Sequence, residues 1–349
     1  MNNRREFLDA VESRLGSLPE AERQRLMIYF ADMLDDRIAM GMDEDAAVDA
    51  LGDVDALIRD AALMPAEARG GSDYGDAIAE VRLHVKNADA EIVAAPLPDG
   101  MSARIEASAS RVFTWRLDGG VLTVQEAGET KRGLFKRDER VKITLSGCRP
   151  AKLIADSYGG DITVEGLEVG ETAVLAASTG DLILKGSACG GRVELTTRSG
   201  DIELAGLRVT GDCKLEALSG DVALKEATVG SLRARTASGD IECEHLRADT
   251  AALGATSGDI QLDDAILGAS LLCETGAGDI DLNSVTAMDA RLSSAAGDID
   301  VRLLACPEGY IIDARSKTGD VDVPKGVPTG TPRRVTAVST GGDITIKFV

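Results

Sequence analysis

The chain has 349 residues, of which 59 are acidic and 38 basic, so its formal net charge at pH 7 is −21. Such a charge repels phosphate backbones and anionic lipid headgroups, which argues against binding to nucleic acid or to a membrane surface. Aromatic residues make up only 3% of the chain, too few for the stacking platforms that hold bases or sugar rings. We therefore expect a protein partner, or a second copy of the chain, and no nucleic acid.

The sequence contains no run of about 18 apolar residues, so no membrane-spanning helix is expected. Its first twenty residues carry charges throughout and lack the apolar centre of a signal peptide, which predicts a cytoplasmic protein. The six cysteines form no Cys-x-x-Cys pair, and His84 and His245 are the two histidines. Neither a zinc site nor the disulfide framework of a secreted protein is expected.

Residues 1–64 have the pattern of a small all-α domain. Phe7, Val11 and Leu15 recur at the spacing of one helical face, and Pro19 suits the first turn of a second helix. A short polar linker, residues 65–75, follows this domain.

A series of residues in this domain occurs in a characteristic order: Phe7-Leu8, Leu15, Leu18-Pro19, Tyr29, Asp36, Gly41, Asp43-Glu44-Asp45-Ala46-Ala47 and Leu51-Gly52-Asp53. This order resembles the HAAS signalling domain, also called domain of unknown function 1700. In that family the helical head lies in the cytoplasm, is often linked to PadR-type transcriptional regulators and usually precedes transmembrane helices. The resemblance implies a docking role, with a PadR-like regulator or a membrane protein as partner; a helical appendage that only caps or dimerises the chain is the alternative.

Between residues 160 and 343, ten Gly-Asp dipeptides recur at intervals of 19 to 23 residues. The residues one and three places after each Asp are apolar and the residue between them is mostly polar, as in Ile202, Glu203 and Leu204. This alternation predicts a strand with one buried face. The aspartates are Asp161, Asp181, Asp201, Asp221, Asp240, Asp259, Asp279, Asp298, Asp320 and Asp343.

Each repeat holds two further apolar stretches. The residues eight and six places before the Asp are apolar in all ten copies, as in Val193 and Leu195. A shorter apolar pair lies six and eight places after the Asp, as Leu304 and Cys306 do after Asp298. The residue four places before the Asp is always small, which indicates a narrow place in the interior.

Three short strands in a repeat of about 20 residues predict a mainly β fold, a right-handed parallel β-solenoid of about ten coils over residues 151–349. An antiparallel sandwich with two zigzag strands per repeat is the alternative. The match of side chains between copies, position by position, favours coils stacked in register at ~4.8 Å. The longer last intervals, with Pro324, Pro328 and Pro332, suit a terminal coil that loops out.

Residues 76–150 lack the Gly-Asp repeat but have the pattern of β structure leading into the solenoid. Residues 78–85 alternate as a strand, 117–121 are typical of a hairpin, and 141–145 resemble a coil placed before the first repeat. Residues 131–140, the one locally basic segment, are expected to form an exposed loop.

The motif Ser/Thr-Gly-Asp-Ile, as in residues 199–202 and 257–260, resembles the repeat of a bacterial adhesin-like family known as Toastrack, or domain of unknown function 4097. Ten copies in phase make this resemblance specific, and it extends over residues 76–349. It implies a structural or interaction module, often found near envelope-stress systems, with no established activity.

The repeat offers few candidates for chemistry. Asp281 and Asp300, in successive coils, are the best acid/base pair, but an acidic solvated face is the favoured explanation of these two residues; His84 and His245 have no recognisable nucleophile as partner. The Gly-Asp aspartates are expected to accept backbone N–H groups at their own corners, with cations bound between them as the alternative. We predict no catalytic residue, no cofactor and no metal site.

All six cysteines fall at positions predicted to face the core, so we expect free, buried thiols that act as small apolar fillers. They are Cys148, Cys189, Cys213, Cys243, Cys273 and Cys306.

Taken together, these features predict a non-catalytic scaffold or interaction protein with a helical docking head on a β-solenoid, in a signalling or envelope-stress pathway. A surface adhesin, or a β-helix protein that binds or cleaves carbohydrate, is the alternative.

Overall fold

The computed structural model describes residues 4–15, 27, 48, 72–74, 77–98, 100–108, 113–127, 139–304, 309–324 and 333–349. The helix α1 (Arg4–Arg14) belongs to the predicted all-α domain. Phe7, Val11 and Leu15 are buried, as the helical spacing predicts. The other predicted helices, most of the linker and most of the basic segment 131–140 lie outside the described residues. No helix in the described part of the chain is long and apolar enough to cross a membrane.

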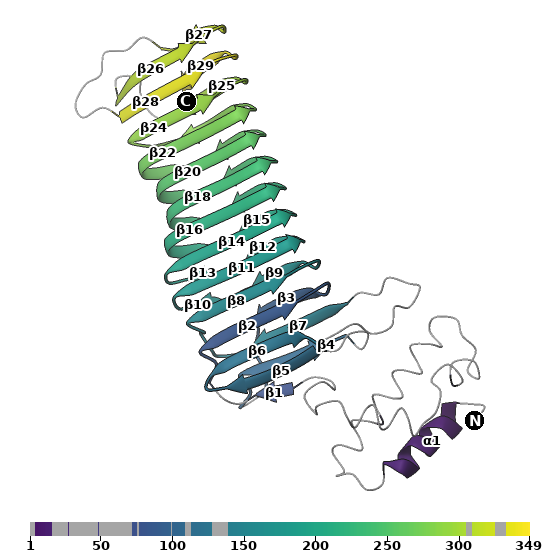
Figure 1. The fold of residues 1–349 in the computed structure, drawn as a ribbon. Coiled ribbons are helices and arrows are strands. Elements are labelled where there is room, and N and C mark those ends of the chain that lie inside the picture. The colour runs from purple at the N-terminus through teal and green to yellow at the C-terminus, as the bar shows by residue number, and fades with distance from the viewer. Residues whose placement is uncertain are drawn as a thin grey trace.

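The predicted parallel β-solenoid is confirmed, and its coils stack into a long rod (Figure 1). Two sheets run the length of the rod, one of 14 and one of 15 strands, which we call sheet A and sheet B. From β8 to β25 every pairing along both sheets is parallel and joins equivalent positions of successive repeats. Stacking in register therefore excludes the antiparallel sandwich.

Sheet A contains the strands that follow the Gly-Asp dipeptides. In spatial order its members are β1 (Ser72–Tyr74), β4 (Ala103–Ala107), β7 (Arg140–Leu145), β3 (Asp89–Ala94), β9 (Ile162–Glu165), β12 (Leu182–Lys185), β15 (Ile202–Ala205), β17 (Val222–Lys225), β19 (Ile241–Glu244), β21 (Ile260–Asp263), β23 (Ile280–Val285), β25 (Ile299–Leu303), β29 (Ile344–Phe348) and β27 (Val321–Asp322).

Sheet B contains the strands that precede the dipeptides. In spatial order its main path is β26 (Tyr310–Ser316), β28 (Arg333–Ser339), β24 (Asp289–Ser294), β22 (Ile266–Ala277), β20 (Arg247–Ser257), β18 (Thr228–Ser238), β16 (Arg208–Ser219), β14 (Arg192–Ser199), β11 (Thr172–Thr179), β8 (Lys152–Ser157), β2 (Glu80–Val85), β6 (Val121–Glu126) and β5 (Phe113–Asp118). The short third strands β10 (Glu168–Val169) and β13 (Ala188–Cys189) pair beside this path, and in β16, β18, β20 and β22 the third strand runs on into the next long strand.

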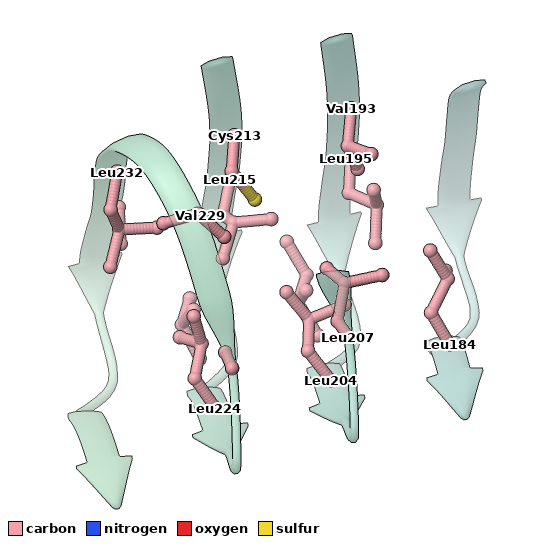
Figure 2. Close-up of a cluster of buried hydrophobic side chains, with 14 of the residues drawn as sticks. Leu184, Val193, Leu195, Leu204, Leu207, Cys213, Leu215, Leu224, Val229 and Leu232 are labelled. Atoms are coloured by element: carbon pink, nitrogen blue, oxygen red, sulfur yellow. The ribbon is translucent and has the colours of Figure 1, made fainter. Parts of the chain in front are cut away.

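Three rows of apolar side chains meet inside the rod, as the repeat pattern predicts. Leu204 comes from sheet A, Leu195 from sheet B and Leu207 from the corner after sheet A, and all three are buried (Figure 2). The alternate residue Glu203 is exposed. Because each coil presents the same three rows, the core is one continuous apolar column.

The third apolar pair was predicted wrongly in the coil of Asp298. Leu303 is buried, whereas the predicted inward residue Leu304 is 45% exposed. The reason is a register shift between β23 and β25. β23 has a corner residue, Ser284, at a φ of 57°, that β25 lacks, so Val285, the residue after Ser284, pairs with Leu303. Cys306 lies outside the described residues.

The order of coils in space differs from their order in the sequence at both ends of the rod. At one end β2 and β3 lie between the coil of β6 and β7 and the coil of β8 and β9. At the other end β28 and β29 lie between the coil of β24 and β25 and the coil of β26 and β27. The expected entry coil, residues 141–145, is thus part of the rod, but β3 separates it from the first repeat. The coil of β26 and β27 ends the rod, and not the last coil of the sequence.

Antiparallel strands cover the rod at the end that holds β5 and β1. The predicted hairpin joins β5 to β6 through Gly119 and Gly120, both with positive φ, as a two-residue hairpin turn requires. The buried Phe113 and Trp115 on β5 pack against the core, so large side chains close this end of the apolar column.

The glycine of each Gly-Asp dipeptide lies directly against the same glycine of the neighbouring coil. A Cβ atom built on Gly220 would lie 2.0 Å from the carbonyl oxygen of Gly200, and φ at Gly220 is 150°. Both the space and the backbone angle therefore exclude a side chain.

We expect Gly220→Ala to lower the free energy of unfolding by about 2 to 3 kcal/mol, because the coils must move apart or the backbone must rotate. Chemical denaturation of the two proteins measures this difference. The matched control is Gly254→Ala on the outer face of sheet B, where the nearest atom to the new Cβ would be 3.8 Å away. Equal losses in the two variants would contradict the close approach.

Candidate functional site

The aspartates of the Gly-Asp dipeptides form one continuous hydrogen-bonded ladder along the rod. The backbone N–H of each Asp donates to Oδ1 of the Asp in the neighbouring coil, as Asp240 does to Asp221 at 2.8 Å. Ten such bonds of 2.7 to 3.1 Å follow one another. The predicted role as a turn residue is correct, but the carboxylate bonds to the next coil and not to its own corner.

The ladder follows the order of the coils in space. Asp89 begins it by accepting the N–H of Asp161, although Ala88 and not Gly precedes it. At the other end Asp298 accepts from Asp343, which in turn accepts from Asp320. The ladder is therefore a property of stacked coils, not of neighbours in the sequence.

The small residue four places before each Asp has a second role that the sequence analysis missed. In several coils its hydroxyl donates to the carbonyl of the preceding coil's glycine, as Thr236 does to Gly220 at 2.9 Å and Ser294 to Gly278 at 3.0 Å. Thr236 and Ser294 are buried, so this bond satisfies a polar group that the narrow corner keeps from water.

Asp281 and Asp300 are neighbours, in register on β23 and β25, with exposed side chains on the outer face of sheet A. Partial burial raises the pKa of Asp281, and the carboxylates of Asp300, Asp279 and Asp259 raise it further, against the opposing effect of Arg302. The structure thus brings the predicted pair together as like charges on a solvated face.

The structure places the two histidines in different surroundings. Nδ1 of His84 contacts Oδ1 of Asp156, its register partner on β8, beside a hollow of about 400 Å³. The buried Glu126 accepts the backbone N–H groups of Lys86 and Asn87 there. This contact could not be predicted from the sequence, because 72 residues separate His84 from Asp156 and the coil of β2 is out of sequence order.

His245 is a corner residue. It adopts a φ of 54° at the position that Gly166, Gly186 and Gly206 occupy in earlier coils. Its ring nitrogens lie 3.8 Å from Oε1 of Glu244 and 3.6 Å from Oδ2 of Asp264. This geometry explains His245 as part of the turn.

A groove of about 540 Å³ lies on the outer face of sheet B. Two rows of side chains line it, and within each row the residues are in register from strand to strand. The first row has carboxylates at its ends and hydroxyls between them; this hydroxyl row is Asp212, Ser231, Thr250, Ser270 and Asp289. The second lies two residues further along each strand; this basic row is Lys214, Arg233, Ala252, Leu272 and Arg291.

Ion pairs occupy both ends of the groove. Nζ of Lys214 lies 2.9 Å from Glu216 and 3.1 Å from Glu194, and these bonds raise the pKa of Lys214. At the other end Arg291 donates to Oδ2 of Asp289 at 2.8 Å. The cations at the two ends are thus paired with carboxylates of the protein, while Oδ1 of Asp289 is buried without a hydrogen-bond partner among the described residues.

The middle of the groove is different. Within the residues that the structure describes, the guanidinium of Arg233 has no ion pair and the hydroxyls of Thr250 and Ser270 make no hydrogen bond. Ala252 and Leu272 form an apolar stretch beside them. The groove therefore offers free donors next to a small apolar surface, an arrangement suited to holding part of another molecule. Sequence analysis missed it, although these side chains occupy equivalent positions of successive repeats.

Five of the six cysteines lie in the described part of the chain, and all five are free. Cys189, Cys213, Cys243 and Cys273 are buried, as predicted, whereas Cys148 is partly exposed. Burial, with a smaller effect of the neighbouring thiol, raises the pKa of Cys213 and of Cys243 to about 12. The thiol chemistry at these positions is therefore suppressed.

The ladder predicts a contrast between two substitutions at Asp221. Asp221→Ala removes the acceptor for the Asp240 N–H and is expected to cost about 1 kcal/mol of unfolding free energy. Asp221→Asn keeps Oδ1 and removes one of a row of like charges, so stability should stay within about 0.5 kcal/mol. Denaturant unfolding with and without a chelator distinguishes this ladder from a row of bound cations. A chelator-sensitive melting temperature, or a loss for Asn equal to that for Ala, would favour cations.

The raised pKa values predict slow alkylation of the core thiols in the native protein. At pH 8 a thiol with a pKa of about 12 has only about one part in 10⁴ as thiolate, the reactive form. Iodoacetamide treatment followed by peptide mass spectrometry should modify Cys148 long before Cys213 or Cys243. The same treatment in denaturant is the control and should modify all of them. Native labelling of Cys243 as fast as that of Cys148 would refute the burial.

Comparisons with known proteins agree with this architecture. The family model Toastrack DUF4097 matches residues 78–263 and 227–349, and the HAAS model matches residues 6–60. No curated protein matches the chain.

Two solved structures with likeness to this one are a candidate adhesin from Bacteroides fragilis NCTC 9343 and a candidate lipid-binding protein from Parabacteroides distasonis ATCC 8503. The first is 16% identical with a TM-score of 0.37, and the match covers 80% of this chain and 96% of the other. The second is 17% identical with a TM-score of 0.40, and covers 80% and 95%. Assignment to a family therefore depends on the family models, and the chain belongs to the Toastrack DUF4097 family, with a HAAS segment at its N-terminus.

Proposed function

We propose that this chain is a non-catalytic cytoplasmic interaction protein, in which the HAAS segment docks a protein partner and the solenoid is a rigid platform in a signalling or envelope-stress pathway. The partner we infer for the HAAS segment is a PadR-type regulator or a membrane protein. The combination of a HAAS segment and a Toastrack solenoid in one chain supports this proposal.

The observation that carries the platform role is the uninterrupted parallel pairing of strands from β8 to β25. Each coil is fixed to the next by backbone pairing in two sheets and by one bond of the aspartate ladder. Such a rod bends little, so it holds its two ends at a fixed separation, which suits a spacer or scaffold.

One observation favours the alternative of a protein that binds or cleaves carbohydrate. Asp281 and Asp300 are adjacent carboxylates, and the pKa of Asp281 is raised, a feature that acid/base pairs share. Their exposure on a flat outer sheet face favours the non-catalytic role.

The proposal predicts that the purified full-length chain binds a purified PadR-type regulator from the same organism, measured by calorimetry. Charge reversal of the exposed α1 residues, Asp9→Lys with Glu12→Lys, should weaken that binding at least tenfold. Glu203→Lys on the outer face of sheet A is the matched control and should leave it unchanged. Absence of binding, together with glycan cleavage that Asp281→Asn abolishes, would establish the alternative.

A further inference from the structure

We propose that the groove between the hydroxyl row and the basic row binds an acidic peptide segment in extended conformation. This inference rests on the proposed function, and it adds the chemistry of one partner and the surface of the solenoid that receives it.

The shape of the groove suits an extended chain. It runs across six strands, from Arg192 on β14 to Arg291 on β24, and five steps of ~4.8 Å give a length of ~24 Å. An extended peptide of seven residues, at ~3.3 Å each, has about the same length. A compact ligand would leave most of this length empty.

The middle of the groove determines which side chains the peptide carries. Arg233 has no ion pair among the described residues, and neither has Arg235, which faces outward two residues further along β18. Together they offer two guanidinium groups to a carboxylate, and a guanidinium binds a carboxylate through paired N–H donors. The side chain that enters here is therefore acidic.

The spacing of the basic row predicts a pattern in the peptide. Arg291 uses one N–H group for Asp289, and its other donors have no partner among the described residues. It lies three strands from Arg233, or ~14 Å at ~4.8 Å per strand, close to the ~13 Å that separates residues four apart in an extended chain. Ala252 and Leu272 occupy the intervening strands and are apolar. The matching sequence is acidic, any residue, apolar, any residue, acidic, with Thr250 and Ser270 bonding its backbone.

Two other polymers fit less well. The lining of the groove includes no aromatic side chain on which a sugar ring could stack. A nucleic acid brings one phosphate charge per nucleotide toward a protein with a net charge of −21. A peptide with two carboxylates carries far less charge, and in the middle of the groove it meets Arg233 and Arg235, whereas the carboxylates of Asp212 and Asp289 lie at the ends.

The test is fluorescence anisotropy with the full-length chain and a labelled peptide, Ala-Glu-Ser-Val-Ser-Glu-Ala. We expect saturable binding that weakens as salt is added. Peptides with Gln or Lys in place of both Glu residues should bind at least tenfold more weakly.

Variants locate the binding. Arg233→Gln with Arg235→Gln should weaken binding of the acidic peptide at least tenfold, and Ala252→Glu should abolish it. Arg198→Gln, an exposed arginine on the same sheet face outside the groove lining, is the matched control and should bind as the parent does. Thermal melts of all variants check that these outward substitutions leave the fold intact.

The inference is overturned if the chain shows no binding of the acidic peptide, if the Gln peptide binds equally well, if the double variant retains full affinity, or if a uronic acid oligomer binds more tightly than the peptide. Calorimetry of the double variant with the PadR-type regulator separates the two proposals. If the parent chain binds the regulator but not the peptide, this inference fails and the proposed docking function stands.

Discussion

The structure depends on one contact, the stacking of glycine on glycine between successive coils. At Gly220 the carbonyl oxygen of Gly200 occupies the space of a Cβ atom. This approach brings the following Asp close enough for its N–H to reach the previous carboxylate. It also brings the previous glycine's carbonyl within reach of the hydroxyl four places before the Asp. One missing side chain per coil thus sets the spacing on which both sheets and the ladder depend.

A repeat that stacks in register also forces like residues into columns, and this has opposite effects inside and outside the rod. Inside, equal apolar residues give a continuous core, as at Leu204 and Leu224. Outside, equal charges repel: burial raises the pKa of Asp281, and the carboxylate of Asp300 beside it raises that pKa further. On sheet B the outward residues vary from coil to coil, as they do along the two rows that line the groove.

The sequence was sufficient to predict strand alternation, coil length and the burial of Cys189, Cys213, Cys243 and Cys273, because each depends on spacing within one repeat. It was insufficient for the order of coils at the ends, since parallel pairing of β2 with β8 or with β6 satisfies the same apolar pattern. The contact of His84 with Asp156 follows from that order and was missed with it. The exposed Leu304 was missed because a corner residue, Ser284, has no counterpart in β25.

The glycine-on-glycine contact is also present at the two ends of the rod, where the coils are out of sequence order. A strand held on one side alone frays and offers an open edge, whereas β2 and β28 are each paired on both sides. Gly319 packs on Gly342, and Gly342 on Gly297, against the order of the sequence. Ala88 stands before Asp89 at the position where the other coils have glycine, and its neighbours explain this exception. Gly160 packs on its carbonyl, but the residues on its other side, Glu139 and Arg140, contain no Gly-Asp dipeptide. Glycine is thus required where a residue packs on the carbonyl of a neighbouring corner, as Gly160 does, and Ala88 has no such corner on its other side.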